Sequence, residues 1–409
     1  MGQLWRHGDF IRLWTGETIE WITGGVTTLA VPTIAILVLN ATPIQMGILT
    51  SLDYVAYPFL GLFAGVLIDR WRRRPVLIWT NIIQFAALGS IPAAFLLGIL
   101  SLYQLFIVTL VMSVTIVFFS IAYTSYLPTL IPREDLVEGN SKLETSSSGA
   151  AVVGPAFAGG LIQILGAAQS VAVDAFGTLL AAVAIVSIRK SEPHPTPGAE
   201  RQFWGELRDG LRSVSENPLL RNLVGATSTL NVGNGMFLAV LYLFIYDQLK
   251  ISPALAGIIL AVGAMGFVIG AVTAPTLLKH FGLGVTLTIA LLINGFGLLA
   301  VQASAYGLAP VLLAGFWSFA NIGIPIYNIN QVSFRQTIVV DKLQGRMNAT
   351  MRTFGYGALT IGALIGGIIG SLYGILSVMT VGPMISLMAA LIIFLGPIRR
   401  LKEIPQISP

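Results

Sequence analysis

Four acidic residues lie inside long apolar stretches of this sequence, away from the ends of the stretches, where a charge is energetically costly. Glu17 and Glu20 lie in the first stretch, Asp53 lies in the second and Asp174 lies in the sixth. A charged side chain at the centre of a bilayer costs about 2.5–3.5 kcal/mol on insertion scales, so such residues are retained mainly for function. The simplest function is to take up and release a proton, which couples a proton gradient to another process. We therefore expect Glu17, Glu20 and Asp53 to bind protons or a cationic substrate.

The spacing of two of these acids predicts their depth. Glu20 lies eight residues after Arg12, and Asp53 lies nine residues after Ile44. At a rise of about 1.5 Å per helical residue, these spacings correspond to depths of about 12 Å and about 13 Å. Both acids are therefore expected near the middle of a hydrocarbon core that is roughly 30 Å thick. The alternative, a protonated acid that only hydrogen-bonds to a neighbouring helix, remains open.

Amide side chains form a second group of polar residues within apolar stretches. Asn231 and Asn234 are three residues apart in the seventh stretch, and Asn321 and Asn328 lie in the tenth. Asparagine in a membrane helix either hydrogen-bonds to a neighbouring helix or lines a cavity that binds substrate, and both remain open. The aromatic candidates for the walls of such a cavity are Trp21, Tyr54, Tyr57, Tyr123 and Trp317.

The composition explains why these polar residues are treated as membrane-embedded. Of the 409 residues, 55% are hydrophobic and only 10% are charged, whereas soluble domains carry about 25% charged residues. The mean hydropathy is +0.83, which excludes soluble, disordered and collagen-like chains. Cysteine is absent and the three histidines are scattered, so we expect no disulfide framework, no metal and no other cofactor.

A membrane-spanning helix needs about 20 mainly apolar residues, and the sequence contains twelve such stretches. They cover residues 12–38, 44–68, 75–98, 102–127, 144–165, 168–188, 219–246, 252–278, 283–303, 307–333, 347–373 and 376–398. Several contain proline, for example Pro32, Pro58 and Pro325, which is tolerated in membrane helices and marks bends. The sequence therefore predicts an all-α membrane protein with twelve transmembrane helices.

The distribution of basic residues predicts the orientation in the membrane. With both termini inside, all of the 23 lysines and arginines except Lys250 fall on the cytoplasmic side, as the bias of cytoplasmic loops requires. This count places Arg335 and Arg352 in or next to cytoplasmic loops. The net charge of +5 is therefore a topology signal for an inner or plasma membrane, and we expect no nucleic-acid partner.

The longest loop divides the twelve spans into two groups of six. Its beginning, SEPHPTPGAE, indicates a flexible linker. A short amphipathic helix is expected after it, with one apolar face formed by Phe203, Leu207, Leu211 and Val214. We therefore expect an N-terminal six-helix bundle over 1–188, a cytoplasmic linker over 189–218 and a C-terminal six-helix bundle over 219–409.

The two halves of the sequence also repeat each other. At an offset of 208 residues, Asn140, Thr145, Gly149, Gly154, Gly159 and Gly166 match Asn348, Thr353, Gly357, Gly362, Gly367 and Gly374. At an offset of 210 residues, Pro43 and Gly47 match Pro253 and Gly257. Parallel six-helix repeats are a transporter architecture that binds substrate near the membrane midplane. The halves are therefore expected to form two pseudo-symmetric bundles.

The segment GVLIDRWRRRPVL (65–77) resembles the loop between the second and third spans of the major facilitator superfamily. That loop has a glycine, an Asp-Arg pair and a basic cluster, which correspond to Gly65, Asp69, Arg70, Arg73 and Arg74. The resemblance implies a cytoplasmic latch in which Asp69 meets the start of the eleventh helix, because a helix N-terminus attracts an anion. Arg72 departs from the pattern, since many members have glycine there.

A second segment, GAAVVGPAFAGG (149–160), is similar to the motif of antiporters and drug exporters in the same superfamily. Glycine lets helices approach closely and proline removes a backbone donor, so the resemblance implies a gate. Its candidate residues are Gly149, Gly154, Pro155, Gly159 and Gly160. Stretches such as FIRLWTGETI (10–19) and LQGRMNA (343–349) resemble the branch of macrolide-efflux and enterobactin-exporting members, so the resemblance covers nearly the whole chain.

These features predict a secondary transporter that exports amphipathic small molecules such as drugs, by alternating access and in exchange for protons. The expected partners are the substrate, protons and membrane lipids, and the expected state is a monomer. The alternatives are export of a siderophore or lysolipid, and proton-coupled import of a nutrient. Many proton-coupled exporters of the family have an arginine in the fourth span; residues 105–123 contain none, so coupling would depend on the acids. With no P-loop and no catalytic constellation in the sequence, an enzyme is not expected.

Overall fold

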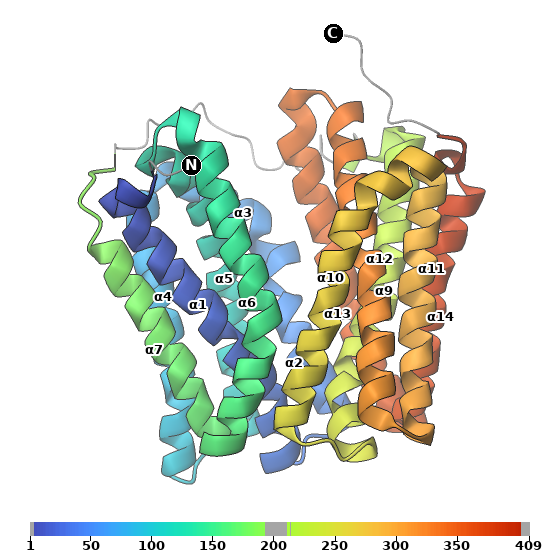
Figure 1. Ribbon diagram of the computed structural model, residues 1–409, viewed down its shortest axis with the longest axis horizontal. Coiled ribbons are helices and arrows are strands. Elements are labelled where there is room, and N and C mark those ends of the chain that lie inside the picture. The colour runs from blue at the N-terminus through green and yellow to red at the C-terminus, as the bar shows by residue number, and fades with distance from the viewer. Residues whose placement is uncertain (1–3, 193–210, 213, 402–409) are drawn as a thin grey trace. The chain divides into compact units, whose positions relative to one another are not determined.

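The structure is a computed structural model in which residues 4–192, 211–212 and 214–401 are described (Figure 1). Within these residues the regular secondary structure is helical. Eleven helical segments in this part of the chain are long and apolar enough to cross a membrane. They coincide with eleven of the twelve predicted spans, so the prediction of a helical membrane protein is confirmed.

The first half of the chain begins with α1 (Gly8–Thr33), which continues into one π-helical turn (Ile34–Val38). The other helices are α2 (Pro43–Tyr54), α3 (Ala56–Arg70), α4 (Arg73–Leu96), α5 (Leu102–Leu130), α6 (Leu136–Leu165) and α7 (Ala167–Val186). Short 3-10 turns at Leu4–Arg6 and Arg133–Asp135 precede α1 and α6.

The second half begins with α9 (Pro218–Leu243), which also continues into a π-helical turn (Phe244–Gln248). The helices that follow are α10 (Pro253–Phe281), α11 (Leu283–Val301), α12 (Ala309–Ile338), α13 (Asp341–Tyr373) and α14 (Ile375–Leu395). Segments of 3-10 helix at Gln302–Tyr306 and Pro397–Arg400 follow α11 and α14. Proline begins both α9 and α10, where its missing N–H would have no partner in the helix anyway.

The second predicted span, 44–68, is divided at Val55, which keeps right-handed helical angles and donates its N–H to the carbonyl oxygen of Ser51 at 3.0 Å. α2 ends at Tyr54 and α3 begins at Ala56, with a turn at Val55 between them. Pro58 explains the division, because it has no N–H for the carbonyl of Tyr54 and its ring crowds that carbonyl. With 12 and 15 residues, neither helix alone reaches the about 20 residues that a span needs. The two helices share the predicted span.

The chain folds into two compact units, and each unit takes a short segment from the other half of the sequence. Unit 1 comprises Met1–Ala41, Phe59–Arg201 and Ser252–Ala261. Unit 2 comprises Thr42–Pro58, Gln202–Ile251 and Val262–Pro409. The division predicted at the linker stays a prediction, because residues 193–210 and 213 lie outside the described residues. Phe203 and Leu207 of the predicted amphipathic helix belong to that undescribed part.

In unit 1, α1 packs against α6 and α7, while α4 packs against α5 and α7 (Figure 1). Glycine permits the close approach of α1 and α6, since a Cβ atom at Gly25 would lie 2.9 Å from the carbonyl carbon of Gly154. Buried apolar side chains, among them Phe10, Leu13 and Tyr126, form a core cluster of this unit. The first transmembrane helix, which carries two of the candidate acids, is therefore held firmly on two sides.

In unit 2, α9 packs against both α13 and α14, α11 packs against α12 and α14, and α2 packs against α13. The approach of α2 to α13 again depends on glycine, because a Cβ atom at Gly47 would lie 2.7 Å from the Cα of Gly367. A core cluster of this unit contains Leu223, Phe334 and Met347. These contacts position the polar residues of α9, α12 and α13.

The internal repeat is visible in the backbone angles. Asn40 and Lys250, which are 210 residues apart, both have left-handed φ angles, 52° and 53°. Each residue follows a π-helical turn and precedes the proline that begins α2 or α10. Gly166 and Gly374, which are 208 residues apart, both have a φ of 84° and connect α6 to α7 and α13 to α14. The backbone thus repeats at the two offsets found in the sequence.

Candidate functional site

Unit 2 contains a cavity of about 620 Å³ among its helices. Its walls come mainly from α9, α12 and α13, with fewer residues from α2, α10 and α11. The structure brings all four predicted substrate-binding asparagines together in its lining: Asn231, Asn234, Asn321 and Asn328. That these residues bind substrate stays a prediction.

Two of these amides also hydrogen-bond to neighbouring helices. Asn231 Nδ2 donates to the carbonyl oxygen of Gly355 at 3.1 Å, and Asn321 Nδ2 donates to the carbonyl oxygen of Gly263 at 3.3 Å. These two residues therefore line the cavity and also hydrogen-bond to a neighbouring helix, two roles that the sequence left as alternatives. Asn234 differs, because its buried Oδ1 has no hydrogen-bond partner in the described part of the chain.

A row of polar side chains on α12 lines the cavity. Its members are Asn321, Asn328, Gln331 and Arg335. Their spacings of seven, three and four residues place them on one face of a helix. The count of basic residues placed Arg335 and Arg352 in or next to cytoplasmic loops, but both line this cavity. The regular spacing from Asn321 through Asn328 to Arg335 is the signal that could have identified Arg335.

Arg335 is a buried charge in this cavity. Its exposed fraction is 7%, and its Nε has no hydrogen-bond partner among the described residues. Gln331 is 6% exposed, and its buried Oε1 also has no partner there. The described lining of the cavity contains no acidic residue. The described lining therefore offers amide groups and positive charge, and contains no carboxylate to neutralise the arginine.

Stacked aromatic pairs form apolar walls of the same cavity. The ring centroids of Phe237 and Trp317 are 5.8 Å apart, with an interplanar angle of 10°. The ring centroids of Tyr54 and Tyr356 are 6.1 Å apart, with an angle of 20°. Aromatic surfaces with a few polar groups between them are typical of pockets for small organic ligands.

Unit 1 holds three of the four acids that lie away from the ends of predicted spans. Glu17 and Glu20 come from α1 and Asp174 comes from α7, and Glu20 interacts electrostatically with both of the others. Glu17 is 1% exposed, and neither of its carboxyl oxygens has a hydrogen-bond partner within the described residues. Asp174 accepts a hydrogen bond from Thr27 Oγ1. Asp174 is therefore held in place by a polar partner, whereas Glu17 is not.

Asp53 belongs to the other unit. It lies near the end of α2, directly before Tyr54, and its side chain is exposed. It interacts electrostatically with Tyr54 and Tyr242, which also belong to unit 2. The structure therefore places Asp53 beside an aromatic residue of the cavity wall, and does not bring it together with Glu17 and Glu20 in one unit.

The basic loop before α4 is held by an acid that the sequence did not single out. The carboxylate of Glu192 accepts hydrogen bonds from the backbone N–H groups of Arg73 at 2.7 Å and Arg74 at 3.0 Å. The Arg74 side chain donates to the carbonyl oxygens of Ile185 and Val186 at the end of α7. These contacts tie two residues of the predicted latch to α7 within unit 1.

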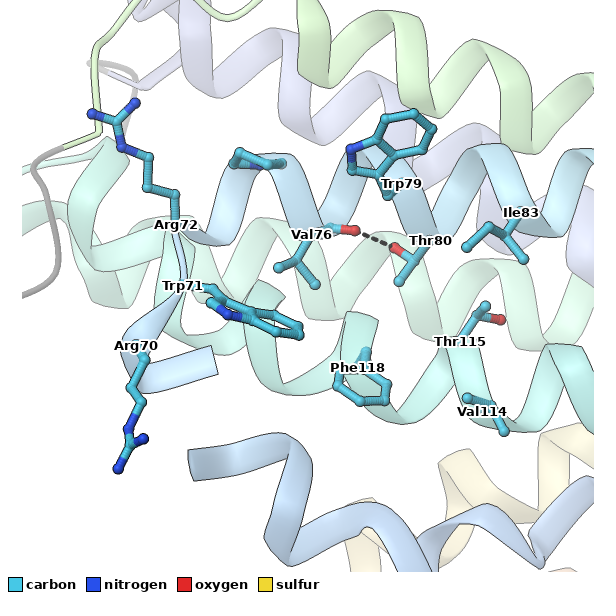
Figure 2. Close-up of a pocket in the computed structure, with 11 residues that line it drawn as sticks. Arg70, Trp71, Arg72, Val76, Trp79, Thr80, Ile83, Val114, Thr115 and Phe118 are labelled. Carbon is cyan, nitrogen blue, oxygen red and sulfur yellow. Dashed lines mark hydrogen bonds between the residues drawn. The ribbon is translucent and has the colours of Figure 1, made fainter. Parts of the chain in front are cut away.

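For two other predicted latch residues, Gly65 and Arg70, the described part of the chain shows no such tie. Gly65 has open space where a Cβ atom would be, and Arg70 is exposed. The side chain of Asp69 lies outside the described part of the chain, so its contact with the eleventh helix stays a prediction. Figure 2 shows that Arg70 and Arg72 lie at one end of a groove beside α4 and α5.

This groove has a volume of about 730 Å³ and mainly apolar walls. The residues that line it include Trp79, Ile83 and Phe118 (Figure 2). Trp79 is largely exposed, with an exposed fraction of 62%. The Thr80 hydroxyl donates a hydrogen bond to the carbonyl oxygen of Val76 at 2.9 Å. The groove therefore presents an apolar surface next to two arginines.

The glycine-rich segment of α6 approaches other helices closely at two positions. Gly154 faces Gly25 of α1, and a Cβ atom at Gly159 would lie 3.1 Å from the Cα of Gly257, which belongs to the same unit. Open space surrounds the other two candidate gating glycines, Gly149 and Gly160. Pro155 lies within α6. The gating role of this segment stays a prediction.

A helical chain with many apolar spans, a repeated fold, a polar cavity and buried acids has the features of a membrane transporter. The sequence model of the Major Facilitator Superfamily matches residues 13–358. The chain therefore belongs to the Major Facilitator Superfamily, as the resemblance at 65–77 implied. It is accordingly a multi-pass membrane transporter of small-molecule substrates and not an enzyme.

Two named relatives match this sequence over most of their length. It is 21% identical over 386 residues to macrolide efflux protein A of Streptococcus pyogenes, covering 90% of each chain. It is 26% identical over 374 residues to the enterobactin exporter EntS of Escherichia coli O1:K1, covering 88% of this chain and 85% of the exporter. Both are members of the branch that the sequence resembles.

Solved structures show the same fold. The nucleoside transporter NupG superimposes with a TM-score of 0.78 at 15% identity, covering 95% of this chain and 98% of the transporter. A bacterial homologue of the iron transporter ferroportin, solved in an inward-facing state, superimposes with a TM-score of 0.74 at 17% identity, covering 96% and 99%. At these identities the likeness establishes the fold alone, and the expected major facilitator fold is confirmed.

Proposed function

We propose that this transporter exports an amphipathic organic molecule in exchange for protons, by exposing one substrate site alternately to the two sides of the membrane. The observation that carries the proposal is the cavity of unit 2. Asparagines and stacked aromatic rings line a volume of about 620 Å³, and pockets for small organic molecules have about 300–1,000 Å³. Asn231, Asn234, Asn321 and Asn328 would orient the substrate there.

The direction of transport is supported by the names of the relatives. Both macrolide efflux protein A and the enterobactin exporter EntS are named for export, and each aligns with most of this chain. The motif at 149–160 supports the same direction. Its close approach to α1 at Gly154 and Gly25 gives α6 a position about which it can tilt, and Pro155 weakens the helix beside it. We assign gating to this segment.

The coupling to protons is supported by Glu17 and Glu20. Burying a carboxylate without a partner is expensive, and neither acid forms an ion pair among the residues that the structure describes. Their retention inside α1 is explained if they take up and release protons during transport. Asp53 serves the same purpose from unit 2.

The basic loop is proposed as the latch of the transport cycle. Gly65, Asp69, Arg70, Arg73 and Arg74 would bias the equilibrium between the two access states. The hydrogen bonds from Arg73 and Arg74 to Glu192, and from Arg74 to the end of α7, support this role. Through them a movement of α7 would reach the loop directly.

We also propose an inner or plasma membrane location, cytoplasmic termini and a monomeric state. The distribution of lysine and arginine supports the orientation. In that orientation the two arginines at the end of the groove beside α4 and α5 (Figure 2) would lie at the cytoplasmic surface, and its apolar walls would face lipid. Lipid acyl chains would then cover Trp79 and Ile83.

The proposal is tested in inverted membrane vesicles with an imposed pH gradient. The probes are fluorescent amphipathic molecules that are cationic, neutral or anionic. Uptake of one class that stops when a protonophore collapses the gradient is the expected result. Uptake into right-side-out vesicles instead would overturn the direction, and uptake indifferent to the protonophore would overturn the coupling. Vesicles without the protein are the control.

A further inference from the structure

We infer that the cavity of unit 2 binds an anionic group of its substrate at Arg335, so that the transported class is an aromatic organic anion, for example an aromatic carboxylate. The inference rests on the proposed function, because it takes this cavity as the substrate site. It adds the charge and the shape of the substrate, which neither the fold nor the relatives specify.

The first argument is the state of Arg335 in the structure. The side chain is 7% exposed and lines the cavity, yet its Nε has no hydrogen-bond partner among the described residues. Guanidinium groups carry five N–H donors and remain charged. A buried charge without partners is unfavourable unless something else supplies them. A ligand that enters the cavity is the available source.

The second argument is the charge around Arg335. The described lining contains a second arginine, Arg352, and no acidic residue. The groups with which Arg335 interacts electrostatically are Tyr327 and Arg352, and neither is a carboxylate. Two like charges facing one cavity repel each other, and an anion between them relieves that repulsion. A cationic substrate would add a third positive charge.

The third argument is that the C-terminus of α12 stabilises the positive charge of Arg335. Arg335 lies in the last turn of α12, which ends at Ile338. The carbonyl groups of a helix C-terminus carry partial negative charge and stabilise a nearby cation. The arginine is therefore preorganised for an anion, and the described lining holds no carboxylate that a ligand would have to displace.

The neighbouring side chains define the rest of the binding group. Gln331 and Asn328 precede Arg335 by one and two turns on the same face of α12 and line the same cavity. Their amide N–H groups can donate to the second oxygen of a carboxylate or sulfonate, while the arginine donates to the first. The ligand is therefore recognised as an acceptor group with a delocalised negative charge.

The aromatic pairs define the body of the ligand. Phe237 and Trp317 form one near-parallel pair in the cavity lining, and Tyr54 and Tyr356 form another. A planar ring can stack on such faces, and stacking contributes about 0.5–1.5 kcal/mol beyond the burial of area. A flat aromatic anion therefore matches both the arginine and the aromatic residues of the lining.

The test compares ligands that differ only in charge. Benzoate, 1-naphthoate and 9-anthracenecarboxylate are each paired with the primary amide and the aminomethyl cation of the same ring system. Binding to the purified full-length protein in nanodiscs is followed by quenching of tryptophan fluorescence, and confirmed with radiolabelled ligand. We expect at least one carboxylate to bind about tenfold or more tightly than its amide, and the cation to bind weakest.

The variants assign this preference to one side chain. Arg335→Gln is expected to reduce the preference for the carboxylate about tenfold, while Arg335→Lys retains part of it. Arg400→Gln removes one charge from an exposed position of the same unit and should leave the preference unchanged. Equal binding of carboxylate and amide by the wild type, in all three ring sizes, overturns the inference even if Arg335→Gln fails to fold. A well-folded Arg335→Gln with undiminished preference also overturns it.

Binding at equilibrium depends on neither the direction of transport nor the coupling ion. A protein that prefers the carboxylates but fails to export in vesicles refutes the proposed function alone. A protein that exports in exchange for protons but prefers the amide or the cation refutes this inference alone.

Discussion

The hydroxyl groups of Thr227 and Tyr327 lie 2.8 Å apart and hydrogen-bond to each other, which ties α9 to α12 in the wall of the cavity. Tyr327 is 1% exposed, and Thr227 is the hydrogen-bond partner of its hydroxyl within the described residues. Because α9 and α12 both carry candidate substrate-binding asparagines, this bond helps to fix the spacing between Asn231 and Asn328.

Removal of this hydrogen bond is expected to destabilise the protein. Tyr327→Phe and Thr227→Val should each lower the free energy of unfolding by about 0.5–1.5 kcal/mol, since a buried hydroxyl is left unsatisfied. The double variant should cost less than the sum of the two, because both changes remove the same bond. Denaturant unfolding in detergent measures the free energy of unfolding of the wild type, both single variants and the double variant, which together form a double-mutant cycle. Additive effects would mean that the two hydroxyls do not act as a pair.

Neutralising the candidate coupling acids should abolish transport driven by the pH gradient without unfolding the protein. Glu20→Gln and Asp53→Asn remove a titratable proton but keep the shape of the side chain. Counterflow exchange without a gradient should continue in both variants. Glu134→Gln, a change of the same kind at an exposed position, is the control. If both variants retain transport that responds to the gradient, the coupling site lies elsewhere in the chain.

Two adjacent glycines in α1 should respond in opposite ways to the same substitution. A Cβ atom at Gly25 would lie 2.9 Å from the backbone of Gly154, whereas a Cβ atom at Gly24 meets nothing within 4 Å. Gly25→Ala should therefore lower stability by about 1–3 kcal/mol through overpacking. Gly24→Ala should raise it by up to about 1 kcal/mol, because alanine favours the helix. The two thermal midpoints, measured in one detergent, compare them directly.

Replacing Leu308 by glycine should stabilise the protein. Leu308 has a φ of 44° and is 76% exposed, so its side chain gains little from burial while its backbone is strained. A left-handed conformation costs a non-glycine residue about 1–2 kcal/mol. Gly98, which is 210 residues earlier, has a φ of 70°, so Gly98→Ala should destabilise. An unchanged thermal midpoint for Leu308→Gly would show that the loop relaxes without cost.

Glu192→Gln should loosen the beginning of α4. The carboxylate accepts two backbone hydrogen bonds there and lies 3.7 Å from the Arg73 guanidinium. Loss of the charge should reduce stability by about 1–3 kcal/mol and speed amide hydrogen exchange at Arg73 and Arg74. Glu216→Gln, which disturbs an exposed pair with Arg212, should change stability by less than about 1 kcal/mol. Equal effects of the two variants would contradict the assigned role of Glu192.

The sequence predicted the helices well because the membrane imposes a length and a composition on each of them. A run of about 20 apolar residues has few other structures available in a bilayer, so the spans follow from counting. The second span is divided into α2 and α3 at Val55, three residues before Pro58, where the proline predicts a bend. The exact residue at which the helix is divided depends on the packing around it, which a single sequence does not contain.

The cavity was predicted in part. Asparagines within apolar stretches stand out by type alone, and the structure brings all four into one lining. Arg335 was not recognised as a cavity residue. An arginine near the cytoplasmic end of a span is also what the excess of lysine and arginine in cytoplasmic loops predicts. Only the position of a side chain around the helix axis separates a residue that faces a loop from one that faces a cavity. Glu192 was missed for a related reason, since its partners lie more than a hundred residues away.

Asn40 and Lys250 share no chemistry, yet both hold the chain in the same left-handed turn after the same π-helical turn. A left-handed residue at this point reverses the chain between two helices, whichever side chain it carries. The two halves are therefore more alike in the torsion angles of this connection than in the side chains along it.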